Sequence, residues 1–393
     1  MSIIRKLASD TAIYGISSVL GRFLSILLTP IHTNWLSGTA DFGLLSYFFS
    51  YIAFINVFLL FGMETTFFRF SEDEKKKGDV YNQAFLVVVS LALFILVFGL
   101  SFPSGISSLL GYPGKETIIM LVAGILAADA FAALPMARLR RQGRAKRFAT
   151  ITIINIVLTV GLNTIFLHFI SKDITWIFVA NLIGSLVRLG LAMISGVPSS
   201  IIPKFGVLKP LLHYGFFIMI AGLAGMMNET LDRILIPRLW EDGTLFQGKT
   251  MSGEQMNGIY AACYKLSMFI ALFTQAFRYA AEPFFFKNAA QKDSPITFAK
   301  VFHYFFLAVL AAFILVSSFS HEIAGFNFFG LFDKPDDPFT FIDSKYEAGL
   351  QVVPILLLAY VCSAAYVNLS IWFKITKQTR FAILFTGVGA LIT

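Results

Sequence analysis

The sequence predicts an all-α protein that crosses a membrane many times, and three observations support this fold class. Of the 393 residues, 57% are hydrophobic and only 14% are charged, whereas a soluble domain usually has about 25% charged residues. The apolar residues are gathered in runs of about 20, the length at which a helix spans the hydrocarbon core of a bilayer. These runs lack the alternation of barrel strands, so they predict helices, which satisfy their own backbone hydrogen bonds in lipid.

Ten apolar segments are long enough to span a bilayer, and an eleventh begins at Phe381 and is still apolar at Thr393. Because such a short run cannot cross a bilayer, we expect that the sequence stops inside a membrane helix and lacks the last helices, and a natural short end is the alternative. The ten segments cover residues 11–31, 42–68, 81–101, 117–137, 148–170, 175–195, 211–237, 257–281, 298–319 and 348–373.

The basic residues predict the orientation, since loops on the cytoplasmic side of a membrane carry an excess of lysine and arginine. With the N-terminus inside, the inner loops hold 19 lysines and arginines and the outer loops hold 6. We therefore expect a cytoplasmic N-terminus. The largest inner group follows the fourth segment and consists of Arg138, Arg140, Arg141, Arg144, Lys146 and Arg147.

The loops exclude several classes of function. They are short, and no sequence pattern for nucleotide binding, metal binding or nucleophilic catalysis stands in a suitable context. The 5 histidines are scattered and both cysteines lie in apolar runs. The basic residues do not form the continuous face that nucleic acid requires. We expect no enzyme, no cofactor, no metal site and no nucleic-acid partner.

The chain repeats itself about halfway, which predicts two bundles. Residues 1–196 contain six segments, and residues 197–393 contain segments seven to eleven. The first repeat has six spans, and an even number of spans returns the chain to the side of the membrane on which it started. The two repeats are therefore parallel and related by an axis along the membrane normal, an arrangement common in transporters. The matching positions are Tyr14-Gly15 with Tyr214-Gly215, Gly21 with Gly222, Asp41-Phe42-Gly43 with Asn257-Gly258, Tyr47 and Tyr51 with Tyr260 and Tyr264, and Glu64 with Glu282.

Two basic residues lie deep in the predicted spans, where an ionised side chain costs about 2.5–3.5 kcal/mol. Arg22 lies near the centre of the first segment, and Lys265 lies about eight residues inside the eighth. Each predicts either a water-filled cavity or a buried ion pair, and intramembrane charges commonly mark function. A cationic cavity would suit an anionic substrate, because Arg binds phosphate through two parallel hydrogen bonds and Lys acts as a point charge.

Other charges in the spans leave two interpretations open. In the first interpretation, Arg188 and Asp129 form a structural ion pair between neighbouring helices. In the second, they have separate functional roles, and Arg188 contacts the substrate. Asp129 and Glu64 are the candidate carboxylates for coupling to a proton or a sodium ion. Arg233 is a candidate substrate contact, but Glu229 precedes it by four residues, so a local ion pair fits equally well.

Tyrosines recur at a spacing of four residues in the second and eighth segments. Tyr47, Tyr260 and Tyr264 are candidate contacts, since their rings could stack against sugars. The alternative is ordinary packing together with an aromatic belt at the membrane interface.

The chain resembles the polysaccharide and O-antigen flippases of the multidrug/oligosaccharidyl-lipid/polysaccharide exporter superfamily along its whole length. The residues that carry this resemblance are Ala12-Ile13-Tyr14-Gly15, Gly21-Arg22-Phe23-Leu24, Leu27-Leu28-Thr29-Pro30, Asp41-Phe42-Gly43, Leu231-Asp232-Arg233-Ile234-Leu235-Ile236, Tyr346-Glu347-Ala348, Val352-Val353-Pro354-Ile355-Leu356 and Tyr366-Val367-Asn368-Leu369-Ser370-Ile371-Trp372-Phe373-Lys374.

The resemblance implies a V-shaped transporter of two bundles in a bacterial inner membrane. Its substrate would be a polyprenyl-pyrophosphate-linked oligosaccharide, such as the O-antigen unit of lipopolysaccharide, which would cross by alternating access while its lipid tail stays among the membrane lipids. Arg22 and Lys265 would then contact the pyrophosphate or acidic sugars.

Three alternatives remain open. A flippase for the peptidoglycan lipid precursor also uses a cationic cavity. A multidrug or metabolite cation antiporter of the same superfamily would favour acidic residues, whereas the deep charges here lean basic. A membrane-embedded glycosyltransferase or polymerase would need a large outer loop with carboxylate or Arg-His clusters, which this sequence lacks.

Overall fold

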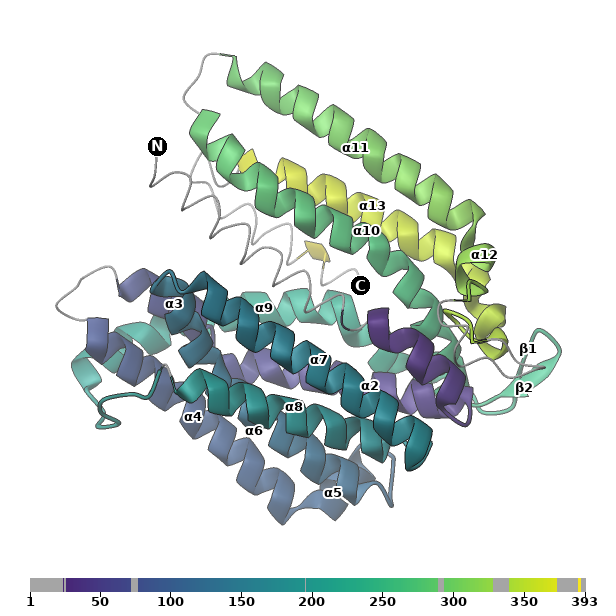
Figure 1. The fold of residues 1–393 in the computed structure, drawn as a ribbon, viewed down its shortest axis with the longest axis horizontal. Helices are drawn as coiled ribbons and strands as arrows, with labels where there is room; N and C mark the ends of the chain where they lie inside the picture. Colours follow the sequence, from purple (N-terminus) through teal and green to yellow (C-terminus); the bar gives the residue numbers. More distant parts are fainter. Residues whose placement is uncertain are drawn as a thin grey trace. The chain divides into compact units, whose positions relative to one another are not determined.

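The computed structural model describes residues 24, 26–71, 77–194, 196–288, 293–327, 339–372 and 388–389. Almost all of this part of the chain is helical (Figure 1), so the predicted all-α class is confirmed. A small antiparallel hairpin, β1 with β2, lies between α9 and α10. The elements are α2 (Thr39–Leu60), α3 (Met63–Phe70), α4 (Lys77–Ser101), α5 (Pro103–Leu109), α6 (Glu116–Arg141), α7 (Ala145–Phe169), α8 (Thr175–Met193), α9 (Phe205–Leu239), β1 (Thr244–Phe246), β2 (Lys249–Met251), α10 (Gly253–Asn288), α11 (Ser294–Ser318), α12 (Ser320–Ala324), the 3₁₀ helix η2 (Ser344–Val352) and α13 (Val353–Leu369).

The predicted spans are confirmed wherever the structure describes them. Within the described ranges, 9 helical spans are long and apolar enough to cross a membrane, by length and composition. They coincide with the nine predicted segments between residues 42 and 373. The predicted segment at 11–31, with Arg22, lies largely outside the described residues, as does the run that begins at Phe381. The chain is a multi-pass membrane protein.

The chain forms two compact units. Unit 1 consists of residues 1–46 and 235–385, and unit 2 of residues 47–234 and 386–393. The boundaries between the units therefore fall within α2 and α9. The predicted division into two bundles at residue 196 stays a prediction.

In unit 1, α10 packs against α11, α13 and η2 (Figure 1). The start of α2 crosses α10 so closely that only glycine fits at the crossing. A Cβ atom on Gly43 would lie 1.9 Å from the carbonyl oxygen of Glu254, and one on Gly258 would lie 1.8 Å from that of Thr39. The Asn257 side chain donates a 2.8 Å hydrogen bond to the Gly43 carbonyl. Small residues commonly allow such contacts between membrane helices.

In unit 2, α6 is the central helix. It is the most buried of the nine spans and packs against α4 and α8, while α7 packs against α8. Small side chains give α6 a slender surface that neighbouring helices can approach closely. Its buried alanines are Ala123, Ala127, Ala128, Ala130, Ala132, Ala133 and Ala137.

The predicted segment 42–68 is divided into α2 and α3 by a break. Phe61 and Gly62 both have positive φ angles, 48° and 64°, which end α2 because a right-handed helix cannot continue through them. The break lies against α9, where a Cβ atom on Gly62 would come within 2.7 Å of the Ile218 Cβ atom. Apolar composition alone does not reveal this break, since the run stays hydrophobic through it.

Candidate functional site

Unit 2 contains an ion pair well inside the predicted membrane spans. The Asp129 carboxylate on α6 lies 3.6 Å from the Arg188 guanidinium on α8, and both side chains are about 30% exposed. The pair joins the two helices that make the most extensive contact in the described part of the chain. The structure therefore brings together Asp129 and Arg188, which the sequence left as either mutual partners or separate functional groups.

A polar side chain on α8 lies beside this pair, and another polar side chain on α7 faces α8. The Ser185 hydroxyl, one turn before Arg188, lies close to the Asp129 carboxylate. On α7, the Asn155 Oδ1 atom faces Gly184 and is buried with no hydrogen-bond partner among the described residues. We call Asp129, Ser185 and Arg188 the charged cluster of unit 2.

The other candidate carboxylate, Glu64, lies in a different part of unit 2. Its Oε2 atom lies 2.5 Å from the Arg140 guanidinium, and both side chains are about one-third exposed. Arg140 also lies over the rings of Phe68 and Phe148, at 5.3 and 5.8 Å. Glu64 therefore joins α3 to the end of α6.

Arg233 is held by its own helix. Its Nε atom lies 3.3 Å from the Asp232 carboxylate, and its guanidinium donates a hydrogen bond to the backbone carbonyl of Glu229. Local partners near the end of α9 thus hold the guanidinium, and the carboxylate that lies beside it is that of Asp232, whereas Glu229, which the spacing of four residues suggested, contributes its backbone carbonyl.

The tyrosines of α2 differ in exposure. Tyr47 is fully buried, and its hydroxyl donates a 3.3 Å hydrogen bond to the Leu110 carbonyl. Its ring packs edge-on against Tyr51 and Tyr112, with centroids 4.9 and 5.1 Å apart. Tyr51 is half-buried. In this structure Tyr47 is a core residue, and Tyr51 is the more accessible ring of the pair.

The predicted contacts of α10 lie in unit 1. Lys265 and Tyr260 are half-buried, while Tyr264 is 9% exposed. The Tyr264 hydroxyl is hydrogen-bonded to that of Tyr360 on α13. Tyr360 is a neighbour of the predicted site that sequence reasoning missed, because nothing in the spacing links it to α10.

Comparison with known proteins identifies the family. Residues 36–323 match the family described as "Polysaccharide biosynthesis protein". The chain belongs to this family. The family predicted from the sequence is therefore confirmed. No curated protein matches this member of the polysaccharide biosynthesis family.

Solved transporters share the fold of this family member. An inward-facing multidrug resistance MATE family transporter of the MOP superfamily matches 94% of this chain and 84% of its own, with a TM-score of 0.69 and 14% identity. An outward-facing transporter of the same description matches 99% and 87%, with a TM-score of 0.56 and 16% identity. A MATE protein in complex with MaD3S matches 98% and 84%, with a TM-score of 0.58 and 15% identity. The family member therefore has the fold of MOP-superfamily exporters.

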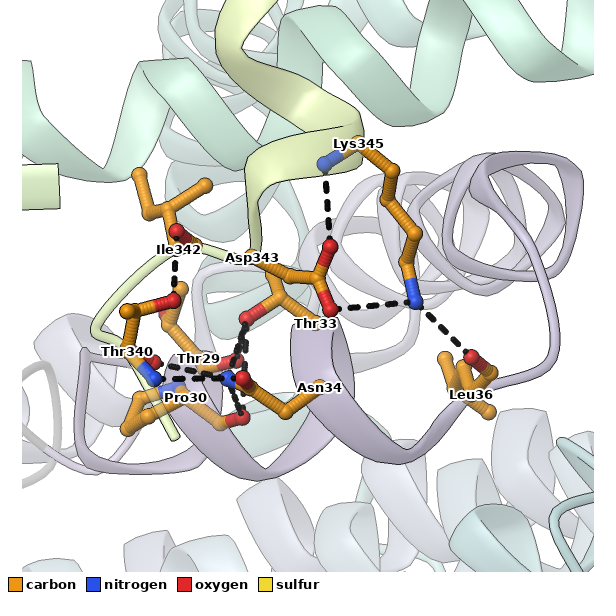
Figure 2. A network of polar contacts seen from close by, with 9 residues as sticks. All are labelled: Thr29, Pro30, Thr33, Asn34, Leu36, Thr340, Ile342, Asp343 and Lys345. Carbon is orange, nitrogen blue, oxygen red and sulfur yellow. Dashed lines mark hydrogen bonds and ion pairs between the residues drawn. The ribbon is translucent and has the colours of Figure 1, made fainter. Parts of the chain in front are cut away.

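A polar network in unit 1, which the sequence did not predict, joins the residues just after the first predicted segment to the loop before η2 (Figure 2). Asn34 donates a 2.7 Å hydrogen bond to the Thr340 carbonyl and accepts one of 3.2 Å from the Thr340 backbone N–H. Lys345 lies 3.6 Å from the Asp343 carboxylate and donates to the Leu36 carbonyl at 3.1 Å. More than 300 residues separate Asn34 from Thr340 and Leu36 from Lys345, so no local pattern indicates these two contacts.

Proposed function

We propose that this protein exports a polyprenyl-pyrophosphate-linked oligosaccharide across a bacterial inner membrane, with its N-terminus in the cytoplasm. One observation carries the proposal: a chain of the polysaccharide biosynthesis family has the fold of MOP-superfamily exporters. The glycan would be an O-antigen or another surface polysaccharide unit. Membrane lipids would hold the polyprenyl tail while the two predicted bundles alternate in access.

The pyrophosphate would be bound by basic side chains that lie deep within the predicted membrane spans. Arg22 can bind two phosphate oxygens at once, and Lys265 can provide a mobile positive charge. Lys265 is half-buried on α10, and so are Tyr260 on the same helix and Tyr360 on α13, whose rings would be the ones accessible to a sugar. Binding has to be modest, because an exporter must release its substrate on the far side.

The Asp129–Arg188 pair would couple export to an ion gradient. Protonation of Asp129, or a sodium ion bound by its carboxylate, would cancel the attraction that holds Arg188 at 3.6 Å. The released guanidinium would then be able to attract an anionic substrate. Asp129→Asn mimics the neutral carboxylate, so export by this variant in proteoliposomes should lose its dependence on a proton or sodium gradient. Unchanged gradient dependence would contradict the role of Asp129.

The central experiment is complementation of a strain that lacks the gene. The wild-type chain should restore surface glycan, and Arg22→Ala should not, although it still inserts in the membrane. Arg69→Ala is the matched control, because Arg69 is exposed near the inner end of α3 and lies 5.1 Å over the Tyr214 ring. Normal glycan display with Arg22→Ala would remove Arg22 from the mechanism.

A second candidate function is multidrug or metabolite cation antiport, which the similarity to MATE structures favours. Under that function, deletion would increase drug sensitivity and leave surface glycan unchanged. A peptidoglycan precursor flippase is the third candidate, and its depletion would instead cause lysis. The three phenotypes are distinct, so one deletion strain separates the candidates.

A further inference from the structure

The segment between α8 and α9, residues 196–204, is fixed to α4 by two buried amide side chains, and we call it the linker. Asn82 and Gln83 are 4% and 1% exposed. Asn82 exchanges two hydrogen bonds with Ser199, at 3.0 and 3.1 Å. Gln83 donates to the Ile202 carbonyl at 2.8 Å and accepts from the Lys204 backbone N–H at 2.9 Å. The linker therefore has a defined path over unit 2, although it is not helical.

The linker also contacts the end of α6, which places it beside the turn between α6 and α7. The Arg138 guanidinium donates a 3.3 Å hydrogen bond to the Val197 carbonyl. The Tyr81 hydroxyl donates to the Gly196 carbonyl, and a Cβ atom on Gly196 would lie 2.8 Å from that of Pro135 in α6. The linker and the α6–α7 turn therefore occupy the same end of unit 2.

The fixed linker presents apolar side chains outward. Val197, Ile201 and Ile202 are 62%, 65% and 69% exposed, and Phe205, the first residue of α9, is 78% exposed. A non-helical backbone does not lie in the hydrocarbon core facing lipid. Apolar side chains on such a segment instead reach the boundary between headgroups and acyl chains, as in interfacial anchors.

Exposed basic side chains lie at the same end of unit 2 as the linker. Arg144, Lys146 and Arg147 at the start of α7 are all exposed, and so is Lys209 in α9. The first turn of α7 contains no acidic residue. Basic residues beside membrane helices attract anionic lipids, each contributing about a fivefold gain in affinity near the surface.

We propose that the linker and the α6–α7 turn form a docking surface for anionic phospholipid headgroups in the leaflet that covers this end of unit 2. The apolar side chains enter the headgroup region, and the four exposed cations contact lipid phosphates. Charge complementarity selects this occupant, because a zwitterionic headgroup offers its phosphate together with a cation. The surface is independent of the exported substrate and of the direction of export.

The test measures lipid binding, so its outcome is separate from the proposed export activity. The purified full chain is titrated in detergent with short-chain phosphatidylglycerol, short-chain phosphatidylcholine or inorganic phosphate, and binding is followed by the shift in thermal unfolding. The test variant is Lys146→Gln with Lys209→Gln. Lys204 stays unchanged, because its ammonium lies 2.6 Å from the Asp79 carboxylate and contributes to holding the linker. The control variant is Lys172→Gln with Lys249→Gln, two exposed lysines in predicted outer loops.

We expect phosphatidylglycerol to bind more tightly than phosphatidylcholine, and inorganic phosphate not to stabilise the protein. The test variant should bind phosphatidylglycerol about 25-fold more weakly, because it loses two such cations, while the control variant binds it normally. Ile201→Ser with Ile202→Ser should also weaken binding, although it keeps every cation. Equal affinity for the two lipids, equal losses in the test and control variants, or stabilisation by phosphate alone would each overturn the proposal.

Discussion

At the scale of single residues, the Asp129–Arg188 pair shows how an intramembrane charge can be tolerated. Each charge would cost about 2.5–3.5 kcal/mol at a helix centre by itself. At 3.6 Å, with side chains about 30% exposed, the two charges offset part of that cost for each other. The contact is longer than a tight charge-assisted hydrogen bond, which leaves the pair able to separate.

The first prediction concerns the stability that this pair provides. Arg188→Gln leaves the Asp129 carboxylate without its counter-ion, and Asp129→Asn leaves Arg188 in the same condition. Each single variant should unfold at lower temperature than the double variant, because removing one partner of a pair costs more than removing both. A double-mutant cycle by thermal unfolding in detergent should give a coupling energy of about 1–2 kcal/mol. Additive losses would show that the two side chains do not stabilise each other.

The second prediction separates the two interpretations of Tyr47. Its hydroxyl is buried against the Leu110 carbonyl, so Tyr47→Phe should lower the free energy of unfolding by about 1 kcal/mol and leave export unchanged. Tyr51→Ala removes the half-buried ring beside it and should reduce export with little effect on stability. The measurements are chemical unfolding and surface glycan display. Lost export with Tyr47→Phe, at unchanged stability, would instead make Tyr47 a substrate contact.

At the scale of helices, the crossing of α2 and α10 depends on glycine at two positions. The third prediction is that Gly258→Ala lowers the free energy of unfolding by about 2–3 kcal/mol, because its methyl group would meet the Thr39 carbonyl at 1.8 Å and force the helices apart. Thermal unfolding measures the loss. The control is Gly225→Ala in α9, where a Cβ atom meets nothing within 4 Å and alanine favours the helix. Equal losses from both variants would show that close approach is not the cause.

The sequence predicted these helices well and their contacts poorly, for a physical reason. Span length and apolar content are local properties, so all nine described spans were predicted from runs of residues. The break at Gly62 depends on packing against Ile218, and the Glu64–Arg140 pair joins positions 76 residues apart. Such contacts arise only when the helices assemble. The candidate site was predicted in part. The positions of Asp129 and Arg188 deep in their predicted spans indicated them as candidates, but only the structure shows that they form a pair.

At the scale of the whole molecule, family and fold agree while the substrate stays a proposal. The fold of MOP-superfamily exporters extends over 94% of the chain at only 14% identity. At that identity almost every side chain has changed, so the shared feature is the arrangement of apolar spans. Function depends on the chemistry of a site rather than on the fold, so the proposed roles of Lys265 and the charged cluster of unit 2 have to be tested residue by residue.

The fourth prediction tests the orientation of the whole chain. The excess of lysine and arginine in alternate loops predicts that the α6–α7 turn lies inside and the α7–α8 loop outside. In a background with Cys263→Ala and Cys362→Ala, a single cysteine is introduced as Lys146→Cys or Lys172→Cys, both at exposed positions. A membrane-impermeant maleimide should label Lys172→Cys in spheroplasts and Lys146→Cys only after lysis. The reverse labelling pattern would show that the chain has the opposite orientation, with the proposed lipid-docking surface in the outer leaflet. The phosphatidylglycerol titration would still measure the affinity of that surface, because it does not depend on orientation.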